Sequence, residues 1–162
     1  MPAGEQLGRD GPLGNFAGSF LLFRFVYLNK EWINQWHQHA VELEIKKNNK
    51  RKALDYVCLP ENTSTSMSLK EALVFSKCTS MDTNNLPVLF VFALQNYKGY
   101  AGFRLNEDKY SAYPLEEEVL LKEGFEVYVL RVETMTVQNR SHEVSELHGK
   151  NITVIHLLNM CY

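Results

Sequence analysis

Cysteine is scarce in this sequence, and its histidines do not form a metal-binding pair. The three cysteines, Cys58, Cys78 and Cys161, are far apart, and none belongs to a CxxC pair. The sequence therefore predicts neither a zinc site nor a disulfide framework. His37 and His39 are two residues apart in a predicted helix, so their side chains face different directions. We expect no metal.

The sequence also lacks a strong net charge and a long apolar run. Its 17 basic and 19 acidic residues give a formal charge of −2, which provides no overall attraction to nucleic acid or to an anionic membrane. No run reaches the roughly 18 apolar residues of a transmembrane helix. Residues 1–18 are rich in Gly and Pro and do not resemble a secretory signal. We therefore expect a flexible leader over 1–18 and a cytoplasmic protein.

The rest of the chain, residues 19–162, has the composition of one globular domain, with 45% hydrophobic and 22% charged residues over the whole sequence. The apolar run at 20–28 predicts a strand, and 29–47 predicts a helix that begins at Asn29. A short helix is predicted over 66–77, capped by a serine at position 66 or 68.

The second half of the chain is rich in β-branched and aromatic residues. This composition predicts strands at 86–95, 116–122, 125–133 and 151–159. Helices in the first half and strands in the second favour an α+β domain over an alternation of strands and helices.

The string "YSAYPLEEEVLL" at residues 110–121 leads three adjacent carboxylates directly into apolar residues. In an extended strand, successive side chains alternate between two faces, so Glu116 and Glu118 share one face and Glu117 points to the other. Two carboxylates this close perturb each other's pKa values, which is typical of a functional site. The alternative is a charged edge that discourages aggregation between strands.

A run of hydroxyl side chains precedes the predicted short helix. In "ENTSTSMSLKEALVFSK", residues 61–77, positions 63–66 read Thr-Ser-Thr-Ser, a composition that alone indicates a turn and a helix cap. The order is more specific, because Ser-Thr-Ser is followed by a helix and then by Glu-x-Glu before Val-Leu-Leu. This order resembles the R-S-E class of mono-ADP-ribosyltransferases, and the resemblance covers about residues 60–159.

The resemblance implies an ADP-ribosyltransferase-like α+β fold, with helices mainly in the N-terminal half and a mixed or antiparallel two-sheet β core in the C-terminal half. It places the family's catalytic glutamate on Glu118 and its companion on Glu116. The Ser-Thr-Ser motif, which lines the NAD site in the family, maps to Ser64, Thr65 and Ser66. Glu118 would stabilise positive charge on the ribose of NAD, and Ser64 would hold that carboxylate.

The family also has an arginine on an early strand, which holds NAD from its phosphate side. The candidate here is Arg24 in "LFRFV", where Phe25 stands at a position that is usually Gly in the family. A strand arginine can equally be a structural ion-pair partner. The helix at 29–47 has no recognised counterpart, so the N-terminal half is divergent. We expect Trp32 and Trp36 to pack this helix onto the sheet, with ligand stacking as the alternative.

The activity that the resemblance implies is transfer of ADP-ribose from NAD to arginine side chains of proteins, with release of nicotinamide. Glu116 would act as general base toward the guanidinium, and a glutamate there goes with arginine as acceptor in the family. Glu117 is predicted to be dispensable. The alternatives are an inactive module that binds or scaffolds, and an enzyme that mainly hydrolyses NAD. The expected partners are NAD and an arginine-bearing protein, with no nucleic acid and no membrane span.

Overall fold

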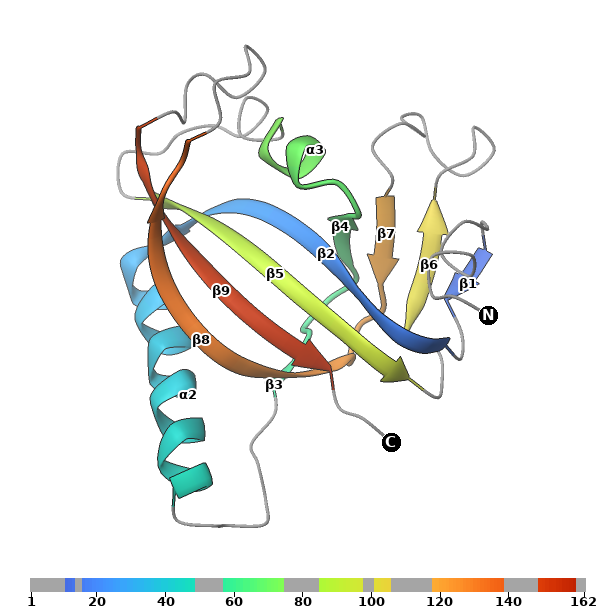
Figure 1. Cartoon of the computed structure of the whole chain (residues 1–162), viewed down its shortest axis with the longest axis horizontal. Coiled ribbons are helices and arrows are strands. Elements are labelled where there is room, and N and C mark those ends of the chain that lie inside the picture. The colour runs from blue at the N-terminus through green and yellow to red at the C-terminus, as the bar shows by residue number, and fades with distance from the viewer. Residues whose placement is uncertain are drawn as a thin grey trace.

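A single curled sheet dominates the structure (Figure 1). The computed structural model describes residues 11–13, 16–48, 57–74, 85–97, 101–105, 118–138 and 149–159. Its strands are β1 (Gly11–Leu13), β2 (Phe16–Asn29), β3 (Val57–Cys58), β4 (Thr63–Ser66), β5 (Asn85–Tyr97), β6 (Gly102–Leu105), β7 (Glu118–Leu121), β8 (Glu126–Thr136) and β9 (Asn151–Asn159). Within these ranges the helices are α2 (Lys30–Asn48) and α3 (Leu69–Val74). The strand order is β1-β6-β7-β4-β2-β5-β9-β8-β3.

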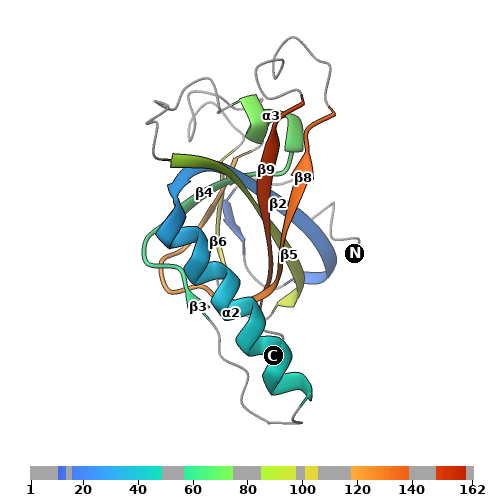
Figure 2. The same cartoon turned by 90° about the vertical axis from the view of Figure 1, so that its left-hand side faces the viewer.

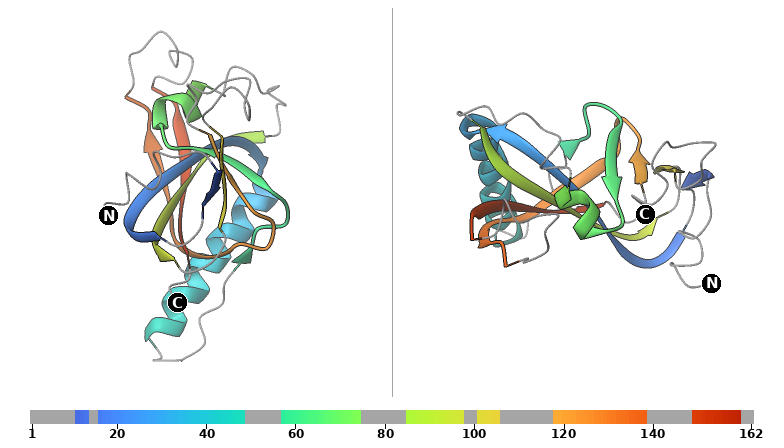
Figure 3. Two further views of the ribbon diagram at one scale, coloured as in Figure 1. Left: turned by 90° about the vertical axis from the view of Figure 1, so that its right-hand side faces the viewer. Right: turned by 90° about the horizontal axis from the view of Figure 1, so that it is seen from above.

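The curl of the sheet follows from a tight turn between two strands that are far apart in the strand order. β7 and β8 are joined by residues 122–125, although four strands lie between them. Gly124 takes a φ of 82° in this turn, and its N–H donates to the carbonyl of Leu59 at 2.8 Å. The N–H of Lys122 donates to Ala101 at 2.9 Å. The turn thus contacts the segments next to β3 and β6, and the strands bend accordingly (Figure 2, Figure 3).

Alternation along the strands gives the sheet two apolar faces. The inner face, on which α2 packs, carries a large core that includes Leu22 of β2, Phe92 of β5 and Leu157 of β9. The outer face carries a smaller core, in which Phe25 of β2 packs with Leu73 of α3. Each face of β2 is therefore buried under a helix, which explains its nearly continuous apolar sequence.

Both predicted helices are present and begin at predicted caps. Asn29 Oδ1 accepts from the N–H of Trp32 at 3.0 Å, and Ser68 Oγ accepts from the N–H of Glu71 at 3.3 Å. The packing face of α2 differs from the predicted one, because the i, i+3, i+7 stripe that begins at Ile33 faces the sheet. Ile33 is 5% exposed and Trp32 is 56% exposed, so the prediction of Trp32 as a core contact is wrong.

The predicted division into a helical first half and a two-sheet second half is also wrong. β1 to β4 lie in the first half, and all strands of the described residues form one sheet. The leader predicted over residues 1–18 is too long, since β1 pairs with β6 and β2 begins at Phe16. Residues 1–10 lie outside the described part. β1, β3, β4 and β6 escape prediction because two to four residues show too little periodicity, and β4 is wholly polar.

Asn159 completes the parallel pairing between β5 and β9. Its side chain is 1% exposed, with Oδ1 accepting from the Gln95 N–H at 2.6 Å and Nδ2 donating to the Gln95 carbonyl at 2.9 Å. The strand register ends one step earlier, at Ala93 and Leu158. The Asn159 amide therefore takes the place of main-chain pairing at the end of the ladder.

Replacement of Asn159 by Ala should lower the free energy of unfolding by about 1–3 kcal/mol, because two main-chain groups lose a buried partner. Asn151→Ala is the matched control at the exposed start of the same strand, where Oδ1 accepts from Thr136 at 2.7 Å. It should cost less than about 1 kcal/mol. Urea unfolding measures both values, and equal losses would contradict this role of Asn159.

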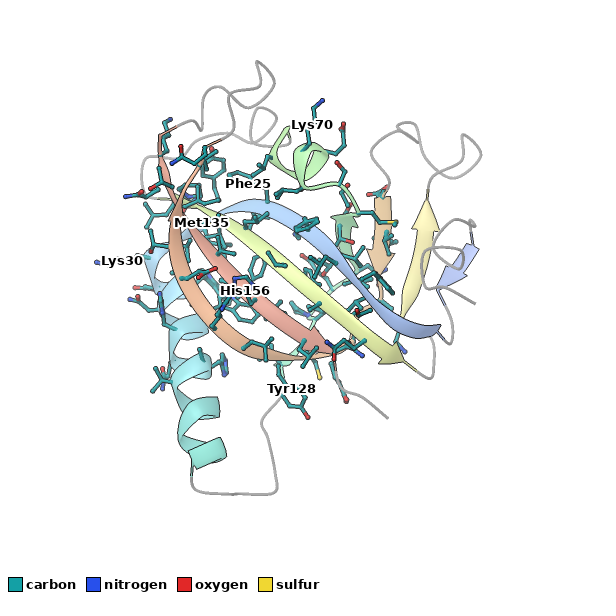
Figure 4. All side chains as sticks on the ribbon, in the orientation of Figure 1. Phe25, Lys30, Lys70, Tyr128, Met135 and His156 are labelled. Atoms are coloured by element: carbon teal, nitrogen blue, oxygen red, sulfur yellow. The ribbon has the colours of Figure 1, made fainter. Side chains whose placement is uncertain are left out.

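A charged cluster on the outer face connects β8 to β9. Nε2 of His156, which lies among the strands in Figure 4, is 2.7 Å from Oε1 of Glu133, and Arg131 is 3.8 Å from the same oxygen. The hydrogen bond from His156 is the main reason why the pKa of Glu133 lies below its ordinary value, and Arg131 adds to this effect. Because the folded-state pKa is lowered, the cluster stabilises the fold above the unfolded-state pKa. That contribution is lost as the pH falls through the folded-state pKa.

His156→Leu should therefore raise the pKa of Glu133 toward its ordinary value of about 4.3. Arg131→Gln should raise it by less, since the arginine is farther away and exposed. Carboxylate chemical shifts followed by NMR titration measure both changes. A pKa that is unchanged in His156→Leu would show that this hydrogen bond does not persist in solution.

Candidate functional site

Three of the predicted site residues lie on three adjacent strands. β4 lies between β2 and β7 in the sheet. Arg24 is on β2, Ser64 is on β4 and Glu118 is on β7. β4 and β7 pair antiparallel with Ser66 opposite Glu118. Ser64 therefore lies diagonally across from Glu118 on the same face of the pair, within reach of its carboxylate.

Ser64 joins Arg24 to Glu118 through two hydrogen bonds. Nη1 of Arg24 donates to the main-chain carbonyl of Ser64 at 2.8 Å, and Oγ of Ser64 donates to Oε2 of Glu118. We refer to these three residues as the Arg–Ser–Glu chain. Its geometry allows one residue to orient a cation and a carboxylate at the same time, which is the arrangement expected of a preorganised charged site.

Thr65 and Ser66 lie deeper than Ser64. Their exposed fractions are 4% and 2%, and Thr65 Oγ1 donates to the Val119 carbonyl at 2.6 Å. Ser66 Oγ accepts from the N–H of Ser68 at 3.0 Å, directly before α3. Both hydroxyls therefore bind neighbouring main chain, which fixes β4 between β7 and α3. The predicted role of Thr65 and Ser66 in binding NAD stays a prediction.

Arg24 is half-buried on the inner face of the sheet. Burial lowers the pKa of Arg24 from its ordinary value, and the carboxylate of Glu61 opposes this shift. Arginine remains charged under such a shift because its ordinary pKa lies far above neutral pH. The site thus holds a partly desolvated cation, which attracts an anion more strongly than a fully hydrated one.

A cavity of about 300 Å³ opens beside Arg24, between α2, the inner face of the sheet and the segment before β4. Its lining residues are Arg24, Val26, Leu28, Trp32, Trp36, Leu59, Pro60, Glu61, Thr63, Phe90, Phe92 and Leu157. Trp36 packs edge-on against Phe90 with ring centroids 5.4 Å apart, so it forms a fixed wall. Sequence reasoning did not single out Glu61. The available signal was an acidic residue at the start of the hydroxyl-rich segment 61–66.

Some predictions for the site concern residues outside the described part of the chain. Glu116 and Glu117 are outside it, so their predicted roles stay predictions. Among the described residues, no group of three or more His, Cys, Asp or Glu side chains is arranged to hold a metal ion. In the same part, no helix has both the length and the apolar character needed to span a bilayer.

The fold of this chain matches that of known protein structures, although its sequence matches no known family. No family model matches the chain, and no curated protein matches it significantly. The ADP-ribosyltransferase Vis from Vibrio splendidus, in complex with the M6 inhibitor, superposes with a TM-score of 0.52 at 18% identity, over 91% of this chain and 50% of Vis. The ADP-ribosyltransferase HopU1 of Pseudomonas syringae pv. tomato DC3000 gives 0.51 at 16% identity, over 90% and 47%. The chain has the ADP-ribosyltransferase fold.

The ADP-ribosyltransferase fold extends beyond the range that the sequence motifs cover. The sequence resemblance is limited to about residues 60–159, whereas the structural matches cover 91% and 90% of this chain. The fold therefore reaches into the N-terminal half, which sequence analysis treats as divergent. The chain spans about half the length of each of these two structures.

The position of β7, which carries Glu118, depends on a close approach of β6. Gly102 pairs with Leu121, and a Cβ added to Gly102 would lie 2.0 Å from the main-chain oxygen of Leu120. No side chain fits there unless β6 and β7 move apart. Glycine at 102 thus lets the two strands approach each other, and it thereby fixes the position of β7, which begins at Glu118.

Gly102→Ala should therefore destabilise the fold by more than about 2 kcal/mol, because main-chain atoms must shift. Gly124→Ala is the control: its φ of 82° strains any side chain, but nothing lies within 4 Å of the added Cβ. It should cost about 1–2 kcal/mol. Urea unfolding measures both, and a smaller loss for Gly102→Ala than for Gly124→Ala would contradict the close approach.

Proposed function

We propose that the chain is an NAD-dependent mono-ADP-ribosyltransferase that transfers ADP-ribose to arginine side chains of proteins and releases nicotinamide. The observation that supports this proposal best is the Arg–Ser–Glu chain, in which Arg24 and Glu118 are both held by Ser64. These three residues lie within an ADP-ribosyltransferase fold. Sequence motif, fold and side-chain contacts therefore support the same reaction class.

Glu118 would act on the ribose next to nicotinamide. In the reaction the bond between ribose C1′ and the nicotinamide nitrogen breaks, and its electron pair leaves with nicotinamide. The ribose ring then carries positive charge, which a carboxylate held beside it stabilises. The hydrogen bond from Ser64 fixes one oxygen of Glu118, so the carboxylate need not reorganise as that charge develops.

Arg24 would bind the diphosphate of NAD. Its guanidinium is charged and partly desolvated, and its bond to the Ser64 carbonyl sets its position relative to Glu118. Guanidinium groups are well suited to phosphate because their planar donors match its oxygens. For these reasons we favour a ligand-binding role of Arg24 over a structural ion pair.

The acceptor side of the reaction would rest on Glu116. A nitrogen of the incoming guanidinium forms a bond to C1′, and Glu116 takes the proton that this nitrogen loses. Arginine as acceptor is proposed from the glutamate at this position in the Glu-x-Glu motif. If water replaces the guanidinium, the same residues hydrolyse NAD, so the acceptor has to be tested directly.

NAD labelled in its adenylate half, incubated with agmatine as a small guanidino acceptor, tests the proposal. Glu118→Gln should reduce label transfer by about 10²–10³-fold, because the carboxylate that stabilises the transition state is lost. Ser64→Ala should reduce it by at least about tenfold through loss of carboxylate positioning. Glu117→Gln, whose side chain is predicted to point to the other face, should leave it unchanged.

Nicotinamide release is measured in the same reactions. Release without transfer to agmatine, abolished in Glu118→Gln, would replace the transferase by an NAD glycohydrolase. If the folded parent protein neither transfers label nor releases nicotinamide, the proposed enzyme activity is wrong and the inactive binding module remains. Equal losses in Glu117→Gln and Glu118→Gln would contradict the face assignment.

A further inference from the structure

The cavity between α2 and the sheet lies on the inner face, whereas the Glu118 carboxylate lies on the outer face. Ser66 pairs with Phe23 of β2 and with Glu118 of β7, so these three side chains share one face of the sheet. Phe23 packs with the core of the outer face, and its neighbour Arg24 lines the cavity on the inner face. A molecule held inside the cavity is therefore separated from Glu118 by the sheet, and the cavity is a site of its own.

Two opposite charges lie on the lining of this cavity without forming an ion pair. Arg24 is half-buried and Glu61 is exposed. The carboxylate attracts the guanidinium, but these two described side chains form neither an ion pair nor a hydrogen bond with each other. One of the five N–H donors of the guanidinium donates to the Ser64 carbonyl, and no other described residue accepts from it. The lining thus provides hydrogen-bond donors of one charge and acceptors of the other at two separate places.

The rest of the lining is mostly apolar and aromatic. Trp36 packs against Phe90 and forms a fixed wall. Trp32, one helical turn before Trp36, lines the same cavity and is 56% exposed. An apolar group that covers this indole is stabilised by removal of both surfaces from water. The volume of about 300 Å³ is at the lower end of the range for ligand pockets, so the cavity suits a small molecule.

We propose that the cavity binds a free α-amino acid with a large apolar side chain. Its carboxylate accepts hydrogen bonds from Arg24, its ammonium group donates to Glu61, and its side chain packs against Trp32 and the fixed aromatic wall. Glu61 repels a ligand that is only an anion, and Arg24 repels one that is only a cation, whereas a zwitterion is attracted by both. A residue at the end of a peptide carries only one of these charges. The free amino acid therefore matches the lining better than a peptide terminus does.

Three ligands that share a phenyl group test the two charges separately. L-Phenylalanine carries both charges, 3-phenylpropionate lacks the ammonium group, and 2-phenylethylamine lacks the carboxylate. Isothermal titration calorimetry gives their dissociation constants for the parent chain. We expect L-phenylalanine to bind at least about tenfold more tightly than either analogue, because each analogue leaves one charged group of the lining without its partner. Glycine, which lacks the apolar group, should also bind at least about tenfold more weakly than L-phenylalanine.

Glu61→Gln removes the carboxylate that would accept from the ammonium group. It should bring the affinities for L-phenylalanine and 3-phenylpropionate close to each other, and it should leave the preference for L-phenylalanine over 2-phenylethylamine. Because Glu61 is exposed, this substitution should not unfold the chain. Glu123→Gln is the matched control, since it removes one charge from an exposed turn residue that is not on the cavity lining. It should leave all affinity ratios unchanged.

Arg24→Gln should make the reciprocal change. The affinities for L-phenylalanine and 2-phenylethylamine should become close to each other, while the preference over 3-phenylpropionate remains, because only the partner of the carboxylate is lost. Thermal unfolding shows whether this variant is folded, since Arg24 also holds the Ser64 carbonyl. If it is not folded, Glu61→Gln decides the question alone.

Trp32 is tested with the same three phenyl ligands. Trp32→Ala should weaken binding of each by about three- to tenfold and leave their ratios unchanged, because the indole contacts the phenyl group that all three share. Trp32 is exposed, so its loss should not unfold the chain. Val41→Ala is the control on the same helix, since Val41 is also exposed and is not on the cavity lining. It should change none of the affinities.

Three results would overturn the inference: no binding of L-phenylalanine by the parent chain, equal binding of the three phenyl ligands, or a preference over 3-phenylpropionate that Glu61→Gln leaves unchanged. Tighter binding of 3-phenylpropionate than of L-phenylalanine would also overturn it and would indicate a site for apolar anions. None of these measurements uses NAD, so their outcome does not depend on whether the proposed transferase is active.

Discussion

The arrangement of the site depends on the two hydrogen bonds that Ser64 makes in opposite directions. Its carbonyl accepts from Arg24 of β2, and its hydroxyl donates to Glu118 of β7. β4 pairs with β7 along its whole length but meets β2 only where Phe23 pairs with Ser66. The guanidinium of Arg24 therefore spans the place where strand pairing is weakest, and it connects the two parts of the curled sheet at the site.

One segment, residues 59–66, links the curl of the sheet to the site. Leu59 accepts from the turn between β7 and β8, and Asn62 Oδ1 accepts from the N–H of Glu123 in the same turn at 2.8 Å. Between these anchors Glu61 lines the cavity, and Ser64 follows Glu61 by three residues. Because the turn fixes both anchors, this short segment sets the distance between the cavity wall and the Arg–Ser–Glu chain.

The sequence predicted the long elements and the contact between Ser64 and Glu118. It did not predict how the sheet is assembled. β9 matches the predicted range 151–159, and α2 begins after the predicted cap Asn29, because long periodic runs and caps are local signals. β4 consists of Thr and Ser, whose composition indicates a turn, and only its neighbours β2 and β7 make it a strand. The single curled sheet arises from contacts such as Gly124 with Leu59, which no local pattern encodes.

The position of Arg24 favours an anion-binding role of its guanidinium over a purely structural one. It stands in the inner-face stripe of β2 between Leu22 and Val26, where an apolar residue would pack without the desolvation that lowers the pKa of the guanidinium. Glu61 offsets part of that cost, but it lies on an open cavity where solvent weakens the attraction. The bond to Ser64 explains where the guanidinium points. An anion bound in the cavity would account for why a charge is kept there at all.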